Sequence, residues 1–191
     1  MTVRAPTITT IESEISTALL KRAKRFEPQA LAALHDHFYP LVFRYISYRV
    51  DNVQVCEDIS GEVFLRLLNY LKNGNQDIHN LRGWLYGTAH HLIQDHYRQG
   101  YRRPTDQLDD HETIPNGHNP EEETMRALAV DQVRSAMRRL TSDQQHVLAL
   151  RFSQELSIQE TALMMKKSVE AVKVLQFRAL AALRRQLEGS R

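Results

Sequence analysis

The segment from Pro104 to Thr124 constrains the fold of this chain more than any other feature. It holds three prolines and an Asn-Gly pair, and it carries seven acidic residues without a lysine or an arginine. Proline removes a backbone donor and clashes with the preceding helical turn, so this segment cannot be one continuous helix. We therefore expect a flexible acidic linker between two separately folded bodies. A plain solvated tether is the simpler interpretation of the same composition.

Both bodies are predicted to be helical. Apolar residues recur at helical spacing along most of the chain, and runs of alternating β-branched residues are missing. Glycine and proline together make up only 13 of 191 residues, which leaves few positions that interrupt helices. We expect an all-α protein with two helical domains. Its parts are an N-terminal extension, a first domain, the linker and a second domain, at residues 1–25, 26–103, 104–124 and 125–191.

The composition argues against several classes of protein. One cysteine, Cys56, cannot form an internal disulfide framework. No stretch approaches the roughly eighteen apolar residues of a membrane span, and Met1 to Ser16 lacks the apolar centre of a signal peptide, so we expect a cytosolic protein. Nine histidines occur, but without His-Glu-x-x-His spacing or a set of cysteine ligands, so neither a metal enzyme nor a cofactor is expected. The positions considered for a metal site are His35, His37, His91, Asp95 and His96.

Three helices are predicted for the first domain. Their expected spans are residues 31–46, 53–71 and 81–98. Pro40 should kink or break the first helix. Asn73-Gly74-Asn75 should end the second, because these residues tolerate the left-handed conformation. The spacing of Trp84 with the apolar residues that follow it places its side chain in the core.

The second domain contains the pattern of a helix-turn-helix. Ser157 and Glu160 form a capping box, in which a hydroxyl and the carboxylate three residues later satisfy backbone N–H groups reciprocally. A short helix should follow to about Met165. After Lys166-Lys167, Ser168 is placed to cap the next helix.

That last helix is predicted to have two distinct faces. The apolar face consists of Val172, Leu175, Ala179, Leu183 and Leu187. Another face carries mixed polar and apolar side chains turned away from the core, which suits a helix that enters the major groove. A second capping box at Thr141 and Gln144 predicts a supporting helix over residues 141–152. An ordinary helical hairpin with a solvated face is the alternative.

Positive charge gathers in two places. Residues 166–191 hold seven lysines and arginines against two glutamates, and residues 82–103 hold four arginines against one aspartate. The net charge of the whole chain is only +2. The clustering, and not the total, therefore indicates nucleic acid as a partner.

Two groups of motifs resemble the sigma factors of bacterial RNA polymerase. The segments 57–67 (EDISGEVFLRL) and 81–89 (LRGWLYGTA) are similar to the second conserved region of that family, at about its usual separation. The segments 140–152 (LTSDQQHVLALRF), 156–162 (LSIQETA) and 168–173 (SVEAVK) are similar to its fourth region. Both regions in this order, without a third-region domain between them, are typical of the extracytoplasmic-function (ECF) type.

The resemblance implies a specificity subunit of RNA polymerase and not an enzyme. In the family, the acidic helix of the second region docks on the clamp helices of the core enzyme, where carboxylates set the register and exposed apolar side chains supply the desolvated contact. The counterpart of helix 141–152 touches the polymerase flap. Carried over to this chain, the core-polymerase-binding residues are Asp58, Glu62, Phe64, Leu65, Arg66 and Leu68. A merely solvated acidic face is the alternative for this helix.

The third helix of the first domain resembles the element that opens and reads the −10 promoter element. Unpaired DNA is bound by cationic grooves and by capture of single bases. The candidate −10 contacts are Asn75, Gln76, Asp77, Arg82, His90, His91, Gln94, Arg98, Arg102 and Arg103. Where the family commonly has Arg-Asn, this chain has His90-His91, so DNA binding is predicted to weaken above neutral pH as these side chains lose their charge.

The last helix resembles the element that reads the −35 promoter element in duplex form. The candidate −35 contacts are Lys166, Lys167, Ser168, Glu170, Ala171, Lys173, Val174, Phe177 and Arg178. Basic side chains suit phosphates or guanine, a glutamate suits cytosine, and apolar side chains suit thymine methyl groups. In related sigma factors the linker threads the polymerase cleft, which would give the acidic residues of 104–124 a role beyond that of a tether.

Two other functions are compatible with the same features. A stand-alone helix-turn-helix regulator would bind duplex DNA without polymerase. A sigma mimic would bind an anti-sigma factor without contacting DNA. For a sigma factor, the expected partners are core RNA polymerase, at its clamp helices and flap, promoter DNA and an anti-sigma factor.

Overall fold

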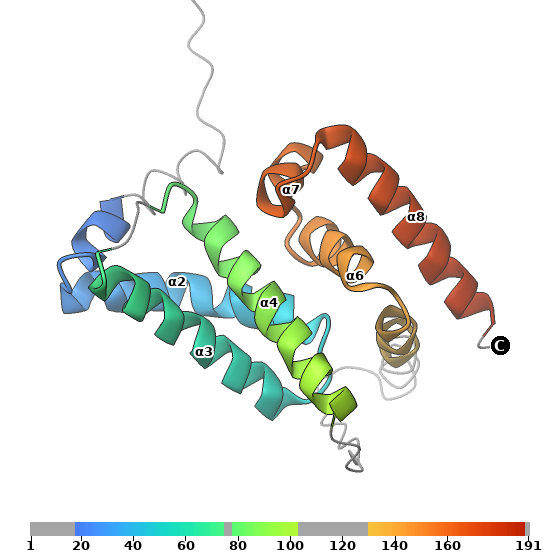
Figure 1. The fold of residues 1–191 in the computed structure, drawn as a ribbon, viewed down its shortest axis with the longest axis horizontal. Helices are drawn as coiled ribbons and strands as arrows, with labels where there is room; N and C mark the ends of the chain where they lie inside the picture. Colours follow the sequence, from blue (N-terminus) through green and yellow to red (C-terminus); the bar gives the residue numbers. More distant parts are fainter. Residues whose placement is uncertain (1–17, 75–77, 103–129, 190–191) are drawn as a thin grey trace, which may run out of the picture.

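Two groups of helices, one from each half of the chain, pack against each other (Figure 1). The structure is a computed structural model that describes residues 18–74, 78–102 and 130–189. The first group contains a helix at 18–23, α2 (Pro28–Ser47), α3 (Val53–Lys72) and α4 (Leu81–Arg102). The second contains a helix at 130–138, α6 (Ser142–Leu148), the π-helix η1 (Ala149–Ser153), α7 (Ile158–Met165) and α8 (Val169–Glu188). Within these ranges every regular element is helical, which confirms the all-α prediction.

Helix α2 runs unbroken through a proline. Pro28 occupies its first turn, where the missing N–H would have no intrahelical partner in any case. Pro40 lies inside the helix, so the predicted break does not occur. Phe38 and Val42 are buried on either side of it, and their packing in the core offsets the loss of one backbone hydrogen bond.

Asparagine and glycine residues set the ends of α3 and α4. Asn52 caps α3, because its side chain accepts a hydrogen bond from the N–H of Val55 at 3.0 Å. Gly74 follows the end of α3 with φ at +60°, a conformation that glycine adopts without strain. Asn80 opens α4 by accepting from the N–H of Gly83 at 2.8 Å. A Cβ atom on Gly83 would lie only 3.1 Å from the Asn80 side chain, so glycine fits this close approach.

A first core lies among α2, α3 and α4. Tyr45 is fully buried in it, and Cys56 is buried as well. Trp84 is half-buried and packs against this core. Leu20 and Ala23, which belong to the expected N-terminal extension, are also buried in it.

A second core lies between α8 and the helices that precede it. Met137, Leu148 and Val172 are among its buried members. However, Leu150 and Leu156 of this half belong to the first core. Figure 1 shows α4 between α3 and the second group, with α6 and α7 on its far side. The two halves of the chain therefore share part of one apolar core.

Two further findings concern the described residues as a set. None of their helices is both long enough and apolar enough to cross a bilayer. In the same ranges, no group of three or more histidine, cysteine, aspartate or glutamate residues is arranged to hold a metal ion. His35 instead contacts the ring of Tyr39, and His96 that of Tyr97, at centroid distances of 4.9 and 5.5 Å.

Candidate nucleic-acid interface

The helix-turn-helix forms where its caps predict it. The N–H of Ser157 donates to Glu160 Oε2 at 2.7 Å, and the N–H of Glu160 donates to Ser157 Oγ at 3.1 Å, which completes the capping box at the start of α7. Ser168 caps α8 by accepting from the N–H of Ala171 at 3.1 Å. Both predicted N-caps are confirmed, and they fix the angle at which α8 leaves α7.

A lysine occupies the turn position where glycine is usual. Lys166 ends α7 with φ at +53° and ψ at +44°, which is the left-handed region. For a residue with a Cβ atom this conformation costs about 1 kcal/mol. Its neighbour Lys167 lies 3.2 Å from a carboxylate oxygen of Asp143 on α6, so one of the two lysines is tied back to the supporting helix.

The outer face of α8 is open to solvent. Val172 and Ala179 are buried on its inner face, and Gln176 accepts from Arg151 Nε at 2.9 Å. Exposed side chains occupy all nine expected −35 positions, namely Lys166, Lys167, Ser168, Glu170, Ala171, Lys173, Val174, Phe177 and Arg178. Phe177 is the most exposed large apolar residue among the described ones, at 74%. The structure thus presents a mixed basic and apolar surface on one helix.

The supporting helix differs from its prediction. The capping box of Thr141 and Gln144 is present, but α6 ends at Leu148. The chain continues as the π-helix η1 to Ser153, a wider turn that commonly marks a functional position. This wider turn carries Leu150 into the core of the other half.

The expected polymerase-binding face of α3 is largely exposed. Leu65 and Leu68 are 56% and 36% exposed, and the exposed Asp58 carboxylate accepts a hydrogen bond from Gln54 at 3.4 Å. Glu62 pairs with Arg66, with 2.8 Å between its Oε1 and the arginine Nε. Two carboxylates and two leucines therefore share one outer surface.

Phe64 is the exception on this helix. Its side chain is only 9% exposed, and its ring lies 5.0 Å from His35 and 5.9 Å from Tyr39, centroid to centroid. The expectation that Phe64 supplies an exposed apolar contact is wrong, because aromatic side chains of α2 cover it.

Apart from Arg82, the expected −10 contacts divide into three sets. Those on the open surface of α4 are His91 and Arg98, and Arg98 also lies 3.3 Å from Asp95. Arg82 is half-buried, with its guanidinium 5.9 Å from the centre of the Tyr86 ring. Outside the described residues lie Asn75, Gln76, Asp77 and Arg103, as does the expected linker at 104–124. Arg102 is the last residue of α4, and its side chain is likewise not described.

The third set is covered by the second half of the chain. The His90 ring stacks on the ring of His146, with centroids 4.1 Å apart and planes inclined at 26°. Gln94 Nε2 donates to Ser142 Oγ at 3.0 Å. His90 is only 9% exposed, so the interpretation of this residue as an exposed DNA contact is wrong in the arrangement seen here.

Arg49 lies at the centre of this junction and was not anticipated from the sequence. Its buried guanidinium donates to Tyr45 Oη at 2.7 Å and to His90 Nδ1 at 2.9 Å. It also donates to Ser142 Oγ at 3.2 Å and to Gln145 Oε1 at 3.4 Å. All four acceptors are uncharged when the histidine is neutral, and two of them belong to α6.

The hydrogen bond from Arg49 requires His90 to be neutral. Arginine has no acceptor, so His90 Nδ1 must accept from Arg49. Tyr45 Oη accepts from Arg49 and is hydrogen-bonded to His146 Nδ1, 2.5 Å away. Burial, followed by the positive charge of Arg49, lowers the pKa of His90 to about 4. Burial lowers the pKa of His146 well below its usual value as well. The predicted loss of a His90 charge above neutral pH is therefore wrong.

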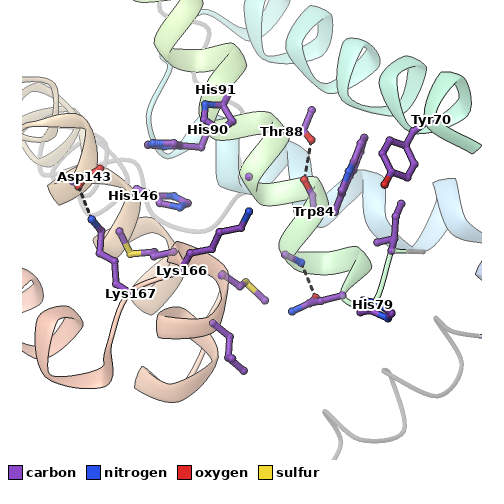
Figure 2. A pocket seen from close by; sticks show the side chains of 17 residues that line it. Tyr70, His79, Trp84, Thr88, His90, His91, Asp143, His146, Lys166 and Lys167 are labelled. Carbon is purple, nitrogen blue, oxygen red and sulfur yellow. Dashed lines mark hydrogen bonds and ion pairs between the residues drawn. The ribbon is translucent and has the colours of Figure 1, made fainter. Parts of the chain in front are cut away.

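A cavity of about 680 Å³ lies beside the histidine stack. Figure 2 shows Trp84, Tyr70 and His91 on one side of it and Lys166 and Lys167 on the other. Residues expected to contact the −10 element and residues expected to contact the −35 element thus line the same space.

Comparison with known proteins identifies the family. The family model for Sigma-70 region 2 matches residues 34–103, and the model for Sigma-70, region 4 matches residues 136–185. The ECF RNA polymerase sigma factor BldN of Streptomyces coelicolor is 35% identical over 172 residues, which cover 88% of this chain and 64% of BldN. The chain therefore spans less than two thirds of the length of that relative.

Solved structures share the fold. CnrH in complex with the cytosolic domain of CnrY matches with a TM-score of 0.69 at 18% identity, covering 93% of this chain and 99% of that chain. The sigma factor RpoE in complex with the anti-sigma factor NepR from Bartonella quintana matches with a TM-score of 0.61 at 14% identity, covering 84% and 98%. The chain belongs to the sigma-70 family of RNA polymerase sigma factors, in its ECF group.

Proposed function

We propose that this chain binds core RNA polymerase and selects promoters through two separate DNA contacts. In this proposal α8 reads the −35 element as duplex, while α4 and the loop before it read the −10 element as it opens. The observation that carries the proposal is the exposed set of nine residues on α8 and its turn, on helices that begin at two N-caps and pack on a core. Because its template is chromosomal DNA, such a protein acts in the cytoplasm.

The chemistry of α8 supports contact with both backbone and bases. Lys173 and Arg178 are exposed cations that suit phosphate or guanine. Val174 and Phe177 place apolar surface on the same helix, at 49% and 74% exposure, which suits thymine methyl groups. If this face of α8 were only solvated, large apolar side chains exposed to water would have no binding role there.

The outer surface of α3 supports the polymerase contact. Its exposed leucines give a small apolar centre, and its carboxylates give charge complementarity to a basic partner. Without the leucines this face would fit a merely solvated helix.

We also propose control by an anti-sigma factor. The RpoE structure of similar fold contains an anti-sigma factor. This chain exposes apolar side chains on α7 and α8, including Leu163 at 72%, and such side chains can supply the desolvated centre of a protein interface.

Run-off transcription with core polymerase on genomic fragments, followed by mapping of start sites, tests the proposed function. We expect defined start sites with the wild-type chain and none with core enzyme alone. Replacing Lys173→Ala and Arg178→Ala together should lower the yield at these sites at least tenfold, because two phosphate or base contacts are lost. Arg184→Ala is the matched control, since Arg184 is an exposed cation of α8 paired with Glu188 and outside the expected −35 set. Its yield should stay within about twofold of wild type.

Two results would contradict the proposal. If the wild-type chain did not confer start-site selection on the core enzyme, the proposed sigma function would be wrong. Specific duplex binding without polymerase, with no effect on transcription by the core enzyme, would instead identify a stand-alone regulator.

A further inference from the structure

The junction between the two halves is built from paired polar groups as well as apolar ones. Tyr45 bonds to His146, Arg49 to Gln145, and Tyr86 donates to Gln154 at 2.6 Å, across 101, 96 and 68 residues of sequence. These six side chains are each no more than 7% exposed. Such matched long-range pairs define a specific contact and not a loose collision of two bodies.

The polar groups of this junction do not depend on one another for solvation. Water would satisfy each of them if the halves separated. The buried Arg49 charge faces uncharged acceptors, so its desolvation is only partly offset in the closed arrangement. At its edge, Arg138 forms an ion pair with Asp51, and both side chains retain some solvent exposure. Interfaces of this mixed kind between domains of one chain resemble transient interfaces.

Closure and DNA binding use the same face of α4. His90 and Gln94 are both engaged by α6 in the closed arrangement. The cavity that remains beside them holds about 680 Å³, which is the volume of a small-molecule pocket and not of a stretch of promoter. Lys166 and Lys167 close its other side, as Figure 2 shows.

We propose that the α4 face is an interaction surface for this chain's own C-terminal half, and that the closed contact around Arg49 keeps α4 from binding promoter DNA until the halves separate. This inference rests on the proposed function for the role of α4, whereas the closed contact itself does not depend on it. The contact acts as an intramolecular competitor: DNA binding at α4 is weakened by the fraction of molecules that are closed.

Two substitutions at one position test the contact in opposite directions. Ser142 accepts hydrogen bonds from Arg49 and Gln94, is half-buried, and is not among the residues expected to contact DNA or the clamp helices. Ser142→Lys places a second cation beside Arg49 and should open the junction. Ser142→Glu places a carboxylate there and should close it further.

A charge-swap pair provides an independent control. Arg138→Asp sets two carboxylates against each other at the edge of the junction and should open it. The double change Asp51→Arg with Arg138→Asp restores an opposite-charge pair and should return the wild-type distribution. A misfolded variant would lose its helical circular dichroism signal. Recovery in the double variant would show that the single change opens the junction and does not disrupt the fold.

Separation of the halves can be measured in the full chain by energy transfer between dyes on cysteines at Lys72 and Arg185, two exposed positions outside the expected sites. We expect efficient transfer in wild type and in Ser142→Glu, and reduced transfer in Ser142→Lys and Arg138→Asp. The affinity for a fluorescent −10 segment with an unpaired strand, taken from a mapped start site, should rise about threefold to tenfold in the two opened variants and fall in Ser142→Glu.

Equal energy transfer in wild type and both opened variants would overturn the closed contact. Lower transfer with unchanged affinity for the −10 segment would overturn its inhibitory role. The energy-transfer result does not depend on whether the chain directs transcription, so failure of the closed contact is distinct from failure of the proposed function.

Discussion

The two helices expected to contact DNA are both basic in sequence and differ in what covers them. All nine expected contacts on α8 and its turn are exposed, whereas α4 has His90 buried and Gln94 bonded to α6. Both helices carry positive charge on a face turned away from their own core. The comparison shows that helical periodicity identifies the side that faces away from a helix's own bundle. It does not reveal a second body that covers that side.

Acid pH should have the largest effect of all the changes considered, and it should act on the covered face of α4 but not on the open face of α8. A histidine whose pKa is lowered in the closed state binds a proton more readily in the open state. Closure is therefore fully favoured above the ordinary histidine pKa of 6.5. It weakens as the pH falls from there toward about 4, the pKa of His90 in the closed state. Each stacked histidine should shift the equilibrium about tenfold per pH unit in this range, giving up to about a hundredfold at pH 5.5. Energy transfer between the two halves should fall accordingly, while the protection of α8 amides from hydrogen exchange, relative to the intrinsic rate at each pH, stays unchanged.

The charged and titratable groups around the stack set this response. Tyr45 faces it from α2, Arg49 from the turn after α2, His91 from α4, Asp143 from α6 and Lys167 from the turn after α7. Four of these five groups are neutral or positive, so the surroundings oppose protonation. His146→Gln keeps an acceptor for Tyr45 and should halve the steepness of the pH response. A response of full steepness in this variant would show that other groups carry it.

The α3 face should behave as an exposed surface that is independent of closure. Asp58→Lys with Glu62→Lys should weaken binding to core polymerase about tenfold, because like charges would meet across the expected interface. The loss should be the same in Ser142→Lys and Ser142→Glu backgrounds, since no residue of this face takes part in the junction. Fluorescence anisotropy with labelled chain would measure it.

Asp36→Lys provides the matched charge reversal, because its carboxylate is exposed on α2 outside the expected face. Its affinity for core polymerase should stay at the wild-type value. The fold should survive in all these variants, since an exposed Glu62–Arg66 pair contributes only about 0.5 kcal/mol or less. An equal loss of affinity for core polymerase in Asp36→Lys would show that the effect of the α3 substitutions comes from net charge alone.

The smallest expected effect concerns the turn before α8. Lys166→Gly should raise the free energy of unfolding by about 0.5–1 kcal/mol, because glycine adopts the left-handed conformation without strain. The same change should lower affinity for −35 duplex slightly by removing a cation. Thermal unfolding and a DNA titration would measure the two effects. A variant that loses stability would show that Lys166 makes a contact that compensates for its backbone conformation.

Local signals made the helix ends predictable. The boxes at Thr141 and Ser157 and the cap at Ser168 depend on residues three positions apart, and all three are confirmed. The end of α3 followed from Asn73 and Gly74. At Pro40 the helix does not break, and its neighbours in sequence did not show that Phe38 and Val42 would be buried on either side of it.

Long-range pairing made the rest unpredictable. Phe64 and His90 are covered by side chains of α2 and α6, and nothing in their own helices indicates this. Arg49 resembles any surface arginine near a helix end, yet it reaches acceptors more than ninety residues away. A local pattern contains no information on such partners.

The burial of Cys56 has a consequence for how this sigma factor responds to oxidants. Its Sγ lies 3.3 Å from the carbonyl oxygen of Val50, and burial raises the pKa of the thiol to about 12. Thiolate is the reactive form of cysteine, so peroxide or a disulfide reagent meets almost none of it here. This is the chain's one sulfhydryl; a redox signal carried by cysteine chemistry would have to reach the chain through another molecule.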